Sequence, residues 1–228
     1  MDVEPPFDAF AARHRRGEAQ VVWTTLVADL ETPVSAMLKL ADERPNSFLL
    51  ESVEGGAVRG RYSFIGLKPD LIWRCRGNAA EINRRAETDP DAFVPCPVST
   101  ADGALASLRA IVAESRIALP ESLPPMAAGL VGYLGYDIVR LIERLPATNP
   151  DALDLPDGMF VRPTVMCVFD NIADSVTLIT PVRAAGGNGK DGGDQALSAD
   201  AAYAAARARL ADTVAEFERR VRYERASP

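Results

Sequence analysis

The sequence contains a single histidine among 228 residues, and this scarcity excludes most histidine-based chemistry. His14 stands in the charged run Arg13-His14-Arg15-Arg16. A Ser-His-Asp triad, a Cys-His pair or a multi-histidine metal site would each have to use this one residue. Histidine-based catalysis is therefore not expected in this chain.

Cysteine is scarce as well. Cys75, Cys96 and Cys167 are odd in number and widely spaced, which fits neither a disulfide framework nor a Cys-x-x-Cys metal knuckle. Free thiols in a reducing compartment are the simplest interpretation. The first six residues lack the basic and then apolar pattern of a secretory signal, and no apolar run is long enough to cross a bilayer. We therefore expect a cytoplasmic protein without a membrane partner.

Basic residues are fewer than acidic ones. The chain carries 32 Asp and Glu against 25 Lys and Arg, a net charge of −7. Binding to nucleic acid favours a basic face, because the phosphate backbone is negatively charged. The charge balance predicts small molecules or proteins as partners, and no nucleic acid.

The remaining composition is that of an ordinary globular domain, with 47% hydrophobic and 25% charged residues. Thr32-Pro33 predicts a helix start, and Gly77-Asn78 predicts a hairpin turn. No helix separates the strands near this turn, so we predict an α+β fold with a largely antiparallel sheet and flanking helices. Helices are expected over residues 102–115, with Asp102 as N-cap, and over 137–144. The expected strands are 20–26, 47–52, 61–66, 71–76, 79–84, 127–133, 164–169 and 175–180.

Three segments are predicted along the chain. Residues 1–183 form the strand-rich domain, and residues 184–198 form a flexible loop with five glycines. Residues 199–228 form a long C-terminal helix, strongly helical as far as residue 222. Its apolar stripe requires a surface to pack against. The stripe consists of Tyr203, Ala206, Leu210, Val214, Phe217 and Val221.

The glycine cluster from Gly129 to Gly135 permits two interpretations. Glycines before a helix can expose backbone N–H groups to a phosphate. However, these glycines recur every three residues, and neither the G-x-G-x-x-G order nor a following Gly-Lys-Ser/Thr is present. We favour a strand packed under a close neighbour.

Two acidic groups follow this cluster. Asp137, Arg140 and Glu143 recur every three residues, which favours a solvated ion pair on one helix flank over a ligand contact. Asp151, Asp154 and Asp157 suggest a divalent cation, but they lack the EF-hand order and lie among prolines. A polar loop is the favoured interpretation of the second group.

Glu51-Ser52 is a polar pair at the end of an apolar strand, followed within about a dozen residues by Arg61, Tyr62 and Ser63. These side chains have the chemistry to hold an amine and a carboxylate together. A cross-strand ion pair between Glu51 and Arg61 explains the same residues about as well.

Several ordered motifs resemble the N-terminal region of anthranilate synthase component I. The resemblance runs from about residue 7 to 183, and the helix after it looks like the connector to that family's chorismate-binding half. The motifs are Gln20 to Leu40, Ser47-Phe-Leu-Leu-Glu-Ser52, Gly60-Arg-Tyr-Ser-Phe-Ile-Gly66, Gly129 to Arg140 with Glu143-Arg-Leu-Pro146, Phe169-Asp-Asn-Ile172 and Thr177-Leu-Ile-Thr180.

The resemblance implies a regulatory role, because Leu49-Leu50-Glu51-Ser52 matches the family's tryptophan feedback motif. It places L-tryptophan against Glu51 and Ser52, with Leu50 beside the indole and Arg61, Tyr62 and Ser63 as weaker contacts. No catalytic residue and no metal site are expected here. The chorismate-binding half, with its Mg²⁺-holding glutamates, would follow residue 228.

The implied parent enzyme converts chorismate, with ammonia from a glutamine amidotransferase partner, to anthranilate and pyruvate. The present chain is expected to be inactive alone and to bind tryptophan weakly. Its last helix would expose an apolar surface and promote self-association if the stripe normally packs on the absent half.

Two alternatives stay open. The related aminodeoxychorismate synthase component I has a similar N-terminal region, in which tryptophan can be held structurally. The other alternative is a stand-alone amino-acid-binding or interaction module without an enzymatic parent.

Overall fold

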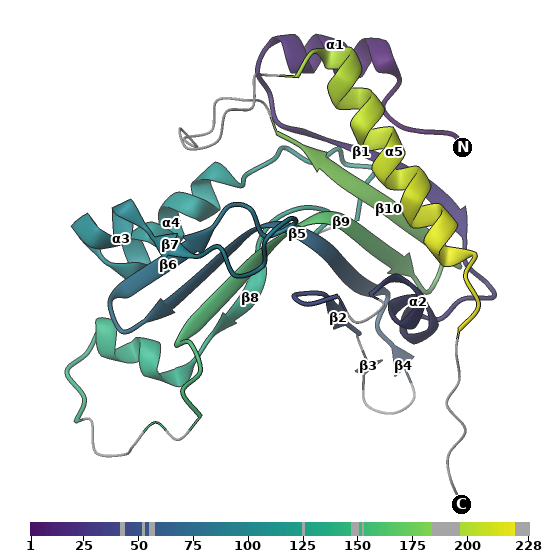
Figure 1. Cartoon of the computed structure of the whole chain (residues 1–228). Coiled ribbons are helices and arrows are strands. Elements are labelled where there is room, and N and C mark those ends of the chain that lie inside the picture. The colour runs from purple at the N-terminus through teal and green to yellow at the C-terminus, as the bar shows by residue number, and fades with distance from the viewer. Residues whose placement is uncertain are drawn as a thin grey trace, which may run out of the picture. The chain divides into compact units, whose positions relative to one another are not determined.

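The computed structural model forms two compact units (Figure 1). The first unit comprises Met1–Leu67, Ile117–Ala128 and Thr164–Pro228, and the second comprises Lys68–Arg116 and Gly129–Pro163. The structure describes residues 1–41, 44–51, 53–54, 58–124, 126–146, 151, 153–183 and 197–221. Most of the predicted glycine loop (184–196) and the end of the predicted helix (222–228) lie outside these residues.

The elements confirm the α+β prediction, because helices flank an antiparallel sheet of eight strands. The sheet order is β1-β10-β9-β5-β6-β7, with β2 paired to β5 and β8 paired to β9. The helices are α1 (Phe7–Arg15), α2 (Pro33–Leu40), α3 (Pro97–Asp102), α4 (Ala104–Glu114), the 3₁₀-helix η1 (Tyr136–Leu141) and α5 (Ala199–Phe217). The strands are β1 (Gln20–Val27), β2 (Phe48–Leu50), β3 (Val53–Glu54), β4 (Val58–Arg59), β5 (Tyr62–Arg76), β6 (Ala79–Asn83), β7 (Val94–Pro95), β8 (Val131–Leu134), β9 (Gly158–Asp170) and β10 (Ser175–Val182).

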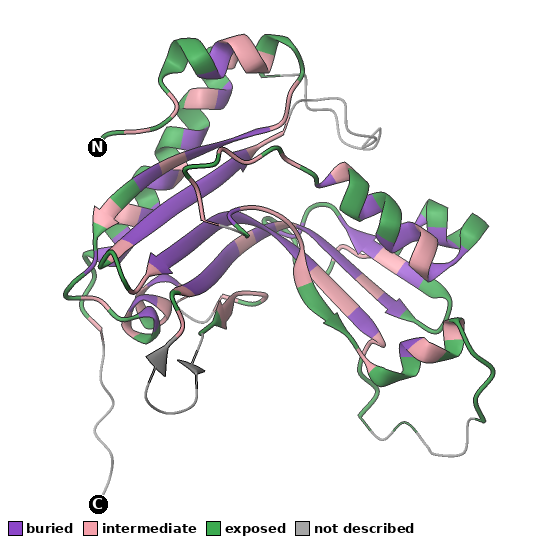
Figure 2. Cartoon of the chain, turned by 180° about the vertical axis from the view of Figure 1, so that it is seen from behind, coloured by how far each residue is buried: buried purple, intermediate pink, exposed green. Residues whose placement is uncertain are grey.

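The first unit buries apolar side chains on both faces of its strands (Figure 2). Helices α1, α2 and α5 contribute to one core, in which Phe10, Leu40 and Ile65 are fully buried. Segment 117–128 covers the other core, which includes Phe64 and Met166. Because successive strand residues point to opposite faces, Phe64 and Ile65 enter different cores.

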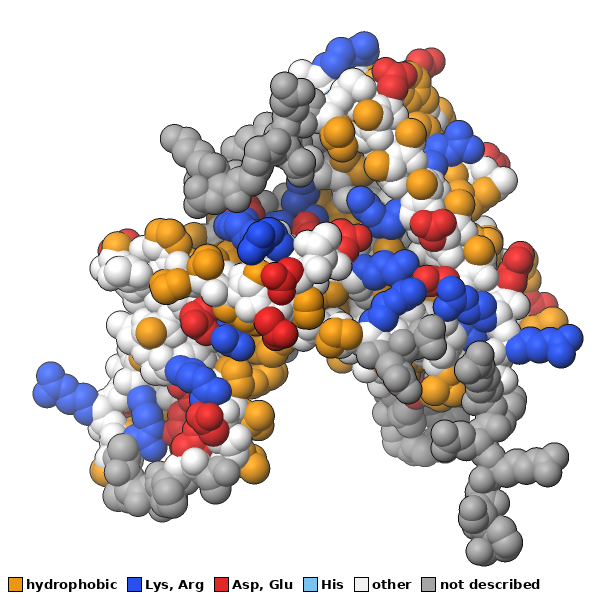
Figure 3. Space-filling view, viewed as in Figure 1, with side chains coloured by type: hydrophobic (Ala, Val, Ile, Leu, Met, Phe, Trp, Pro, Cys, Tyr) orange, Lys and Arg blue, Asp and Glu red, His pale blue; other side chains and the backbone are white. Residues whose placement is uncertain are grey.

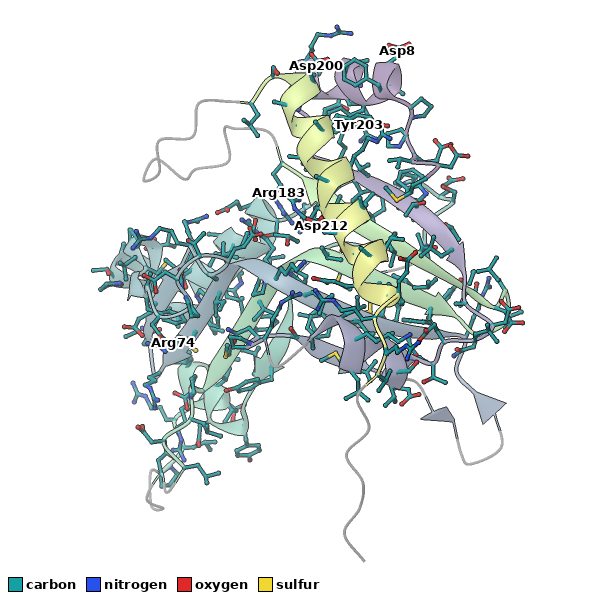
Figure 4. The ribbon with its side chains drawn as sticks, turned by 45° about the vertical axis from the view of Figure 1, so that its right-hand side comes forward. Asp8, Arg74, Arg183, Asp200, Tyr203 and Asp212 are labelled. Carbon is teal, nitrogen blue, oxygen red and sulfur yellow. The ribbon has the colours of Figure 1, made fainter. Side chains whose placement is uncertain are left out.

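Helix α5 ends at Phe217, before the predicted end, so Val221 of the predicted stripe lies outside the helix; the stripe as far as Phe217 packs within the first unit. Ala206, Leu210 and Phe217 are buried in the core beside β10. Tyr203, which Figure 4 labels on α5, packs its ring 4.9 Å from that of Phe10 and donates a hydrogen bond to the carbonyl of Pro5. The stripe from Tyr203 to Phe217 is therefore covered within this unit and is not an exposed apolar surface, while self-association stays a prediction.

The second unit has its own core between its strands and helices α3 and α4. Trp73 is fully buried there, and its indole N–H donates a 2.8 Å hydrogen bond to the Ser107 hydroxyl. The indole ring can be fully buried because its N–H has a hydrogen-bond partner in the Ser107 hydroxyl.

Two local signals in the sequence are confirmed. The Thr32 hydroxyl accepts a hydrogen bond from the backbone N–H of Ser35, and the Ser35 hydroxyl accepts one from Thr32, so a capping box begins α2. Gly77, at φ +51°, and Asn78 join β5 to β6, with Arg76 opposite Ala79. Each signal works because it satisfies backbone geometry within a few residues.

The predicted helix over 102–115 is wrong at its start. Gly103, at φ +88°, separates α3 from α4, and Asp102 ends α3. The amide oxygen of Asn78 accepts from the backbone N–H of Ala104 at 3.0 Å. A side chain from the distant hairpin turn therefore caps the first N–H group of α4, a role that was expected of Asp102.

The strands predicted over 61–66 and 71–76 form one strand, β5. The Lys68-Pro69 pair between them suggests an interruption, and Lys68 does adopt a positive φ of 51°. The strand nevertheless continues, because β2 and β6 pair with its two ends. The other expected strands and the short helix are present with shifted ends.

The three cysteines are free, as predicted, and the structure shows that all three are buried. Burial, with the nearby charge of Asp157, raises the pKa of Cys75 to about 11. A thiol with so high a pKa stays protonated and unreactive at neutral pH. Among the described residues, no helix is both long and apolar enough to span a membrane.

Candidate functional site

Five of the six residues predicted to contact tryptophan, all except Ser52, lie where strand β2 ends beside the start of β5. Leu50 is the last residue of β2 and lies opposite Phe64 in the antiparallel ladder. Glu51 and Ser63 each lie one residue beyond this last pair, so the ladder brings them next to each other. The pairing of β2 with β5 therefore joins two motifs that the sequence separates.

The two residues at this ladder end differ sharply in exposure. Glu51 is exposed, whereas Ser63 is 1% exposed and its hydroxyl has no hydrogen-bond partner among the described residues. The hydroxyl of Ser47, just before β2, is likewise buried without a partner there. A buried hydroxyl left without a partner costs about 1–3 kcal/mol.

Strand geometry divides the predicted contacts between two faces. Tyr62 and Phe48 pack against the core that contains Phe64, while Ser63 shares the face of Ile65. Leu50 lies on the Phe64 side and is 41% exposed. Tyr62 and Ser63 therefore point to opposite sides of β5 and do not line one concave surface.

Arg61 takes a carboxylate partner other than Glu51. Its guanidinium contacts Asp170 at 2.9 Å and lies 4.8 Å from the centre of the Tyr62 ring. Asn171 adds two hydrogen bonds of 2.8 Å, from its backbone N–H to the Arg61 carbonyl and from its side chain to the Gly60 carbonyl. Together these contacts anchor the start of β5 to the turn between β9 and β10.

Sequence reasoning missed this anchor. The sequence predicts a polar turn at residues 170–174 and a motif of the resemblance at Phe169-Asp-Asn-Ile172, but not the contacts to β5, although Asp and Asn at a strand end are typical of side chains that bond to nearby backbone. Ser52 lies outside the described residues, as does the glycine pair at 55–56. The assignments of all six residues to a tryptophan site stay predictions.

The anchor has a defined pH dependence. The hydrogen bond from Arg61 is the main cause that holds the pKa of Asp170 below its usual value. A carboxyl with a lowered folded-state pKa stabilises the fold above its unfolded pKa of about 3.9, and the effect disappears as pH falls through the lower, folded value. We expect Asp170→Asn to lower the free energy of unfolding at neutral pH. Urea denaturation at successive pH values should show the deficit closing in acid, and an equal deficit at about pH 3 would contradict this.

The acidic residues of the second unit that were singled out in the sequence contact different partners and do not converge on one site. Arg140 pairs with Asp137 at 2.6 Å on the surface, which confirms the predicted ion pair, although Glu143 is outside it. Arg76 contacts Asp154 at 2.6 Å, and Asp157 accepts a 2.6 Å hydrogen bond from the Gly77 N–H. Within the described ranges, no group of three potential ligands is arranged to hold a metal ion.

The glycine cluster serves close strand packing, as favoured. A Cβ on Gly132 would collide with the Met159 carbonyl oxygen and lie 2.7 Å from the Cα of Phe160. Strand β8 pairs with β9 in this register, with Gly132 opposite Phe160. Glycine is required because the neighbouring backbone occupies the space of a side chain.

His14 has a structural environment. Its Nε2 lies 2.9 Å from the carbonyl oxygen of Leu197, and its ring stacks on Phe10 with centroids 5.6 Å apart. These contacts hold α1 against the start of α5.

No family model matches the chain. It is 48% identical over 213 residues to "Anthranilate synthase component 1" of Cereibacter sphaeroides, which covers 93% of this chain and 40% of that protein. Proteins of the same name from Thermus thermophilus and Synechocystis sp. are 42% and 36% identical, covering 70% and 78% of this chain and 31% and 34% of their own lengths. The crystal structure of anthranilate synthase component I from Streptococcus pneumoniae TIGR4 superposes with a TM-score of 0.47 at 17% identity, over 85% of this chain and 38% of that one. The chain thus spans two fifths or less of these curated relatives.

Proposed function

The chain is homologous to the N-terminal portion of anthranilate synthase component 1, and from this premise we propose that it is the tryptophan-binding regulatory part of such an enzyme. The observation that carries the proposal is the ladder end of β2 and β5. There Glu51, which is exposed and belongs to the Leu49-Leu50-Glu51-Ser52 motif, stands one position past the last ladder pair, across from Ser63, whose hydroxyl is buried and has no hydrogen-bond partner among the described residues.

The two groups have complementary roles toward an amino acid. The carboxylate of Glu51 would accept charge-assisted hydrogen bonds from the ammonium of tryptophan. The hydroxyl of Ser63 would supply a hydrogen bond to the polar end of the ligand and gain the partner it lacks. Leu50 lies on the Phe64 face, opposite to that of Ser63, so we propose that it acts indirectly, as Tyr62 does. Arg61 and Tyr62 would act indirectly, because Arg61 is engaged with Asp170 and Tyr62 faces the other core.

The chemistry is proposed to belong to the part of the enzyme that follows this match in the relatives. That part would bind chorismate, hold Mg²⁺ through its own glutamates and receive ammonia from a glutamine amidotransferase subunit to form anthranilate and pyruvate. This chain would be inactive alone. Its contribution is a binding free energy for tryptophan that differs between the active and inhibited states of the whole enzyme.

A hybrid enzyme tests this role. The chain would replace the matching N-terminal portion of the Cereibacter sphaeroides relative, and anthranilate formation would be followed by its fluorescence. We expect Ser52→Phe to raise the tryptophan concentration for half inhibition about tenfold or more, because a large side chain in the feedback motif would exclude the effector. Turnover without tryptophan should stay within about twofold.

Ser122→Phe provides the matched control, because Ser122 is an exposed serine in the segment between α4 and β8. This variant should be inhibited like the unsubstituted hybrid. If Ser52→Phe is inhibited normally, the site assignment is wrong.

A further inference from the structure

The backbone just before Ser63 is held by the turn between β9 and β10. The Arg61 guanidinium donates hydrogen bonds of 2.9–3.2 Å to both carboxylate oxygens of Asp170. Asn171 donates from its backbone N–H to the Arg61 carbonyl and from its side chain to the Gly60 carbonyl, each at 2.8 Å. Two neighbouring residues of the turn thus grip the segment that leads into Ser63.

Asp170 is fixed by its own turn. Its Oδ1 also accepts hydrogen bonds from the backbone N–H groups of Ile172 at 3.0 Å and Ala173 at 3.3 Å. An aspartate that bonds to the backbone two and three residues further on stabilises a turn. The Asp170 side chain is 14% exposed and the Arg61 side chain 54%. The aspartate is therefore the fixed partner, and Arg61 is the residue that it holds.

An exposed ion pair alone would indicate nothing about function. Figure 3 shows basic and acidic side chains beside one another across the visible face, and such pairs contribute little to stability. The Arg61–Asp170 pair differs because the Asn171 hydrogen bonds to backbone carbonyls accompany it. These contacts act on the backbone itself, so they restrict where the start of β5 can lie.

Ser63 depends on this support because its own side chain supplies none. Its hydroxyl has no hydrogen-bond partner among the described residues, and the described ladder with β2 ends one residue later, at Phe64. On the other side β5 neighbours β9 in the sheet, and the turn holds Arg61 where β9 ends. The backbone on both sides of Ser63 therefore determines where its hydroxyl lies.

We propose that Asp170 and Asn171 are positioning residues for the tryptophan site, which act through Arg61 to hold Ser63 across from Glu51. The inference rests on the proposed function. A binding group that is held in place before the ligand arrives lowers the cost of ordering it, and this raises affinity. The turn between β9 and β10 thereby sets how tightly tryptophan binds without touching it.

The hybrid enzyme defined above tests this role. Asn171→Asp keeps the size of the side chain but removes the amide N–H that donates to the Gly60 carbonyl. We expect it to raise the tryptophan concentration for half inhibition about fivefold or more. Calorimetry should show the same loss of affinity, and turnover without tryptophan should stay within about twofold. Normal inhibition of this variant would overturn the inference.

A double-variant cycle separates positioning from direct contact. If Arg61 acts only through Asp170, then Arg61→Met, Asp170→Asn and the double variant should weaken inhibition by the same factor, because each removes the same interaction. If Arg61 contacts tryptophan itself, Arg61→Met would weaken inhibition far more than Asp170→Asn. That second result would contradict a positioning role for Asp170.

Arg13→Met is the matched control. Arg13 on α1 pairs with Glu18 at 3.2 Å, and the two side chains are 32% and 41% exposed. The variant therefore removes a surface ion pair of the same unit with the same change of charge as Arg61→Met. It should leave the half-inhibiting concentration within about twofold. An equal loss of inhibition in Arg13→Met would show that the Arg61–Asp170 pair has no particular relation to the site.

A purely structural role of the turn predicts a different pattern. The variants at Asp170 and Asn171 would then lower the melting temperature and the amount of active hybrid, while the folded fraction kept its tryptophan affinity. Thermal melting by circular dichroism and calorimetry of the folded hybrid measure the two quantities separately. Lower stability with unchanged affinity would refute the positioning role.

The proposed function and this inference can fail separately. If Ser52→Phe relieves inhibition while the variants at Asp170 and Asn171 are inhibited normally, the positioning role alone is refuted. A hybrid that tryptophan does not inhibit, or that Ser52→Phe does not relieve, refutes the proposed function and removes this inference with it.

Discussion

Replacing Arg162 with methionine should lower the free energy of unfolding by about 3–5 kcal/mol, because it removes one partner of a buried ion network. Arg162 lies on β9 with its side chain 9% exposed. It contacts Asp70 on β5 at 2.7 Å and Glu114 at the end of α4 at 3.0 Å. Methionine fills much of the same volume but leaves both carboxylates without this cation.

The network extends one step further, to Arg84. Its guanidinium makes two 2.7 Å hydrogen bonds to Glu114. Burial opposes ionisation of Glu114, but the hydrogen bonds and charges of Arg84 and Arg162 prevail and lower its pKa. Since the folded pKa is depressed, this stabilisation is present above the unfolded value and is lost as pH falls through the folded value. The cost of Arg162→Met should therefore shrink in acid.

Urea denaturation of the chain measures this effect, with Arg140→Met as the matched control. Arg140 forms a single exposed ion pair with Asp137, and such pairs contribute about 0–1 kcal/mol. Similar losses for the two variants would show that the buried network does not hold the second unit together as described.

The second large effect is expected at Gly132. Alanine there would force its methyl group against the backbone of Met159 and Phe160, which the β8–β9 ladder fixes in place. Since backbone atoms cannot rotate away as a side chain does, the two strands must separate. We expect Gly132→Ala to lower the free energy of unfolding by about 1–3 kcal/mol and to speed amide exchange in β8.

Gly135 supplies the comparison within the same segment. A Cβ there would lie 3.1 Å from the Asp157 carbonyl oxygen, and φ is −69°, which any residue adopts. Gly135→Ala should therefore cost less than about 1 kcal/mol. Equal destabilisation by the two substitutions would refute the close approach at Gly132.

The features that the sequence predicted correctly are local ones. Thr32-Pro33 and Gly77-Asn78 act within a few residues, so their types alone indicate the capping box and the hairpin turn. The strand segments and their antiparallel pairing follow from apolar runs without intervening helices. Helix α1 was missed because its polar sequence buries only Phe10 and Ala11, too few to show a stripe.

The features that were missed depend on contacts between distant residues. Asn78 caps α4 from the hairpin turn, and Asp170 holds Arg61 across 109 positions of sequence. The candidate site shows the same limit. The motif residues were found together in the sequence, but strand alternation separates Tyr62 from Ser63, and the unpartnered hydroxyl of Ser63 becomes evident only in the folded chain.

Calorimetric titration of L-tryptophan into the hybrid enzyme measures directly whether this chain contributes the tryptophan-binding site. We expect saturable tryptophan binding by the hybrid and loss of that binding in the Ser52→Phe hybrid. Binding by the chain alone should be weak or undetectable. We expect weak binding by the chain alone because the resemblance implies that residues of the C-terminal portion complete the tryptophan pocket. Undiminished binding by the Ser52→Phe hybrid, or submicromolar binding by the chain alone, would contradict these expectations.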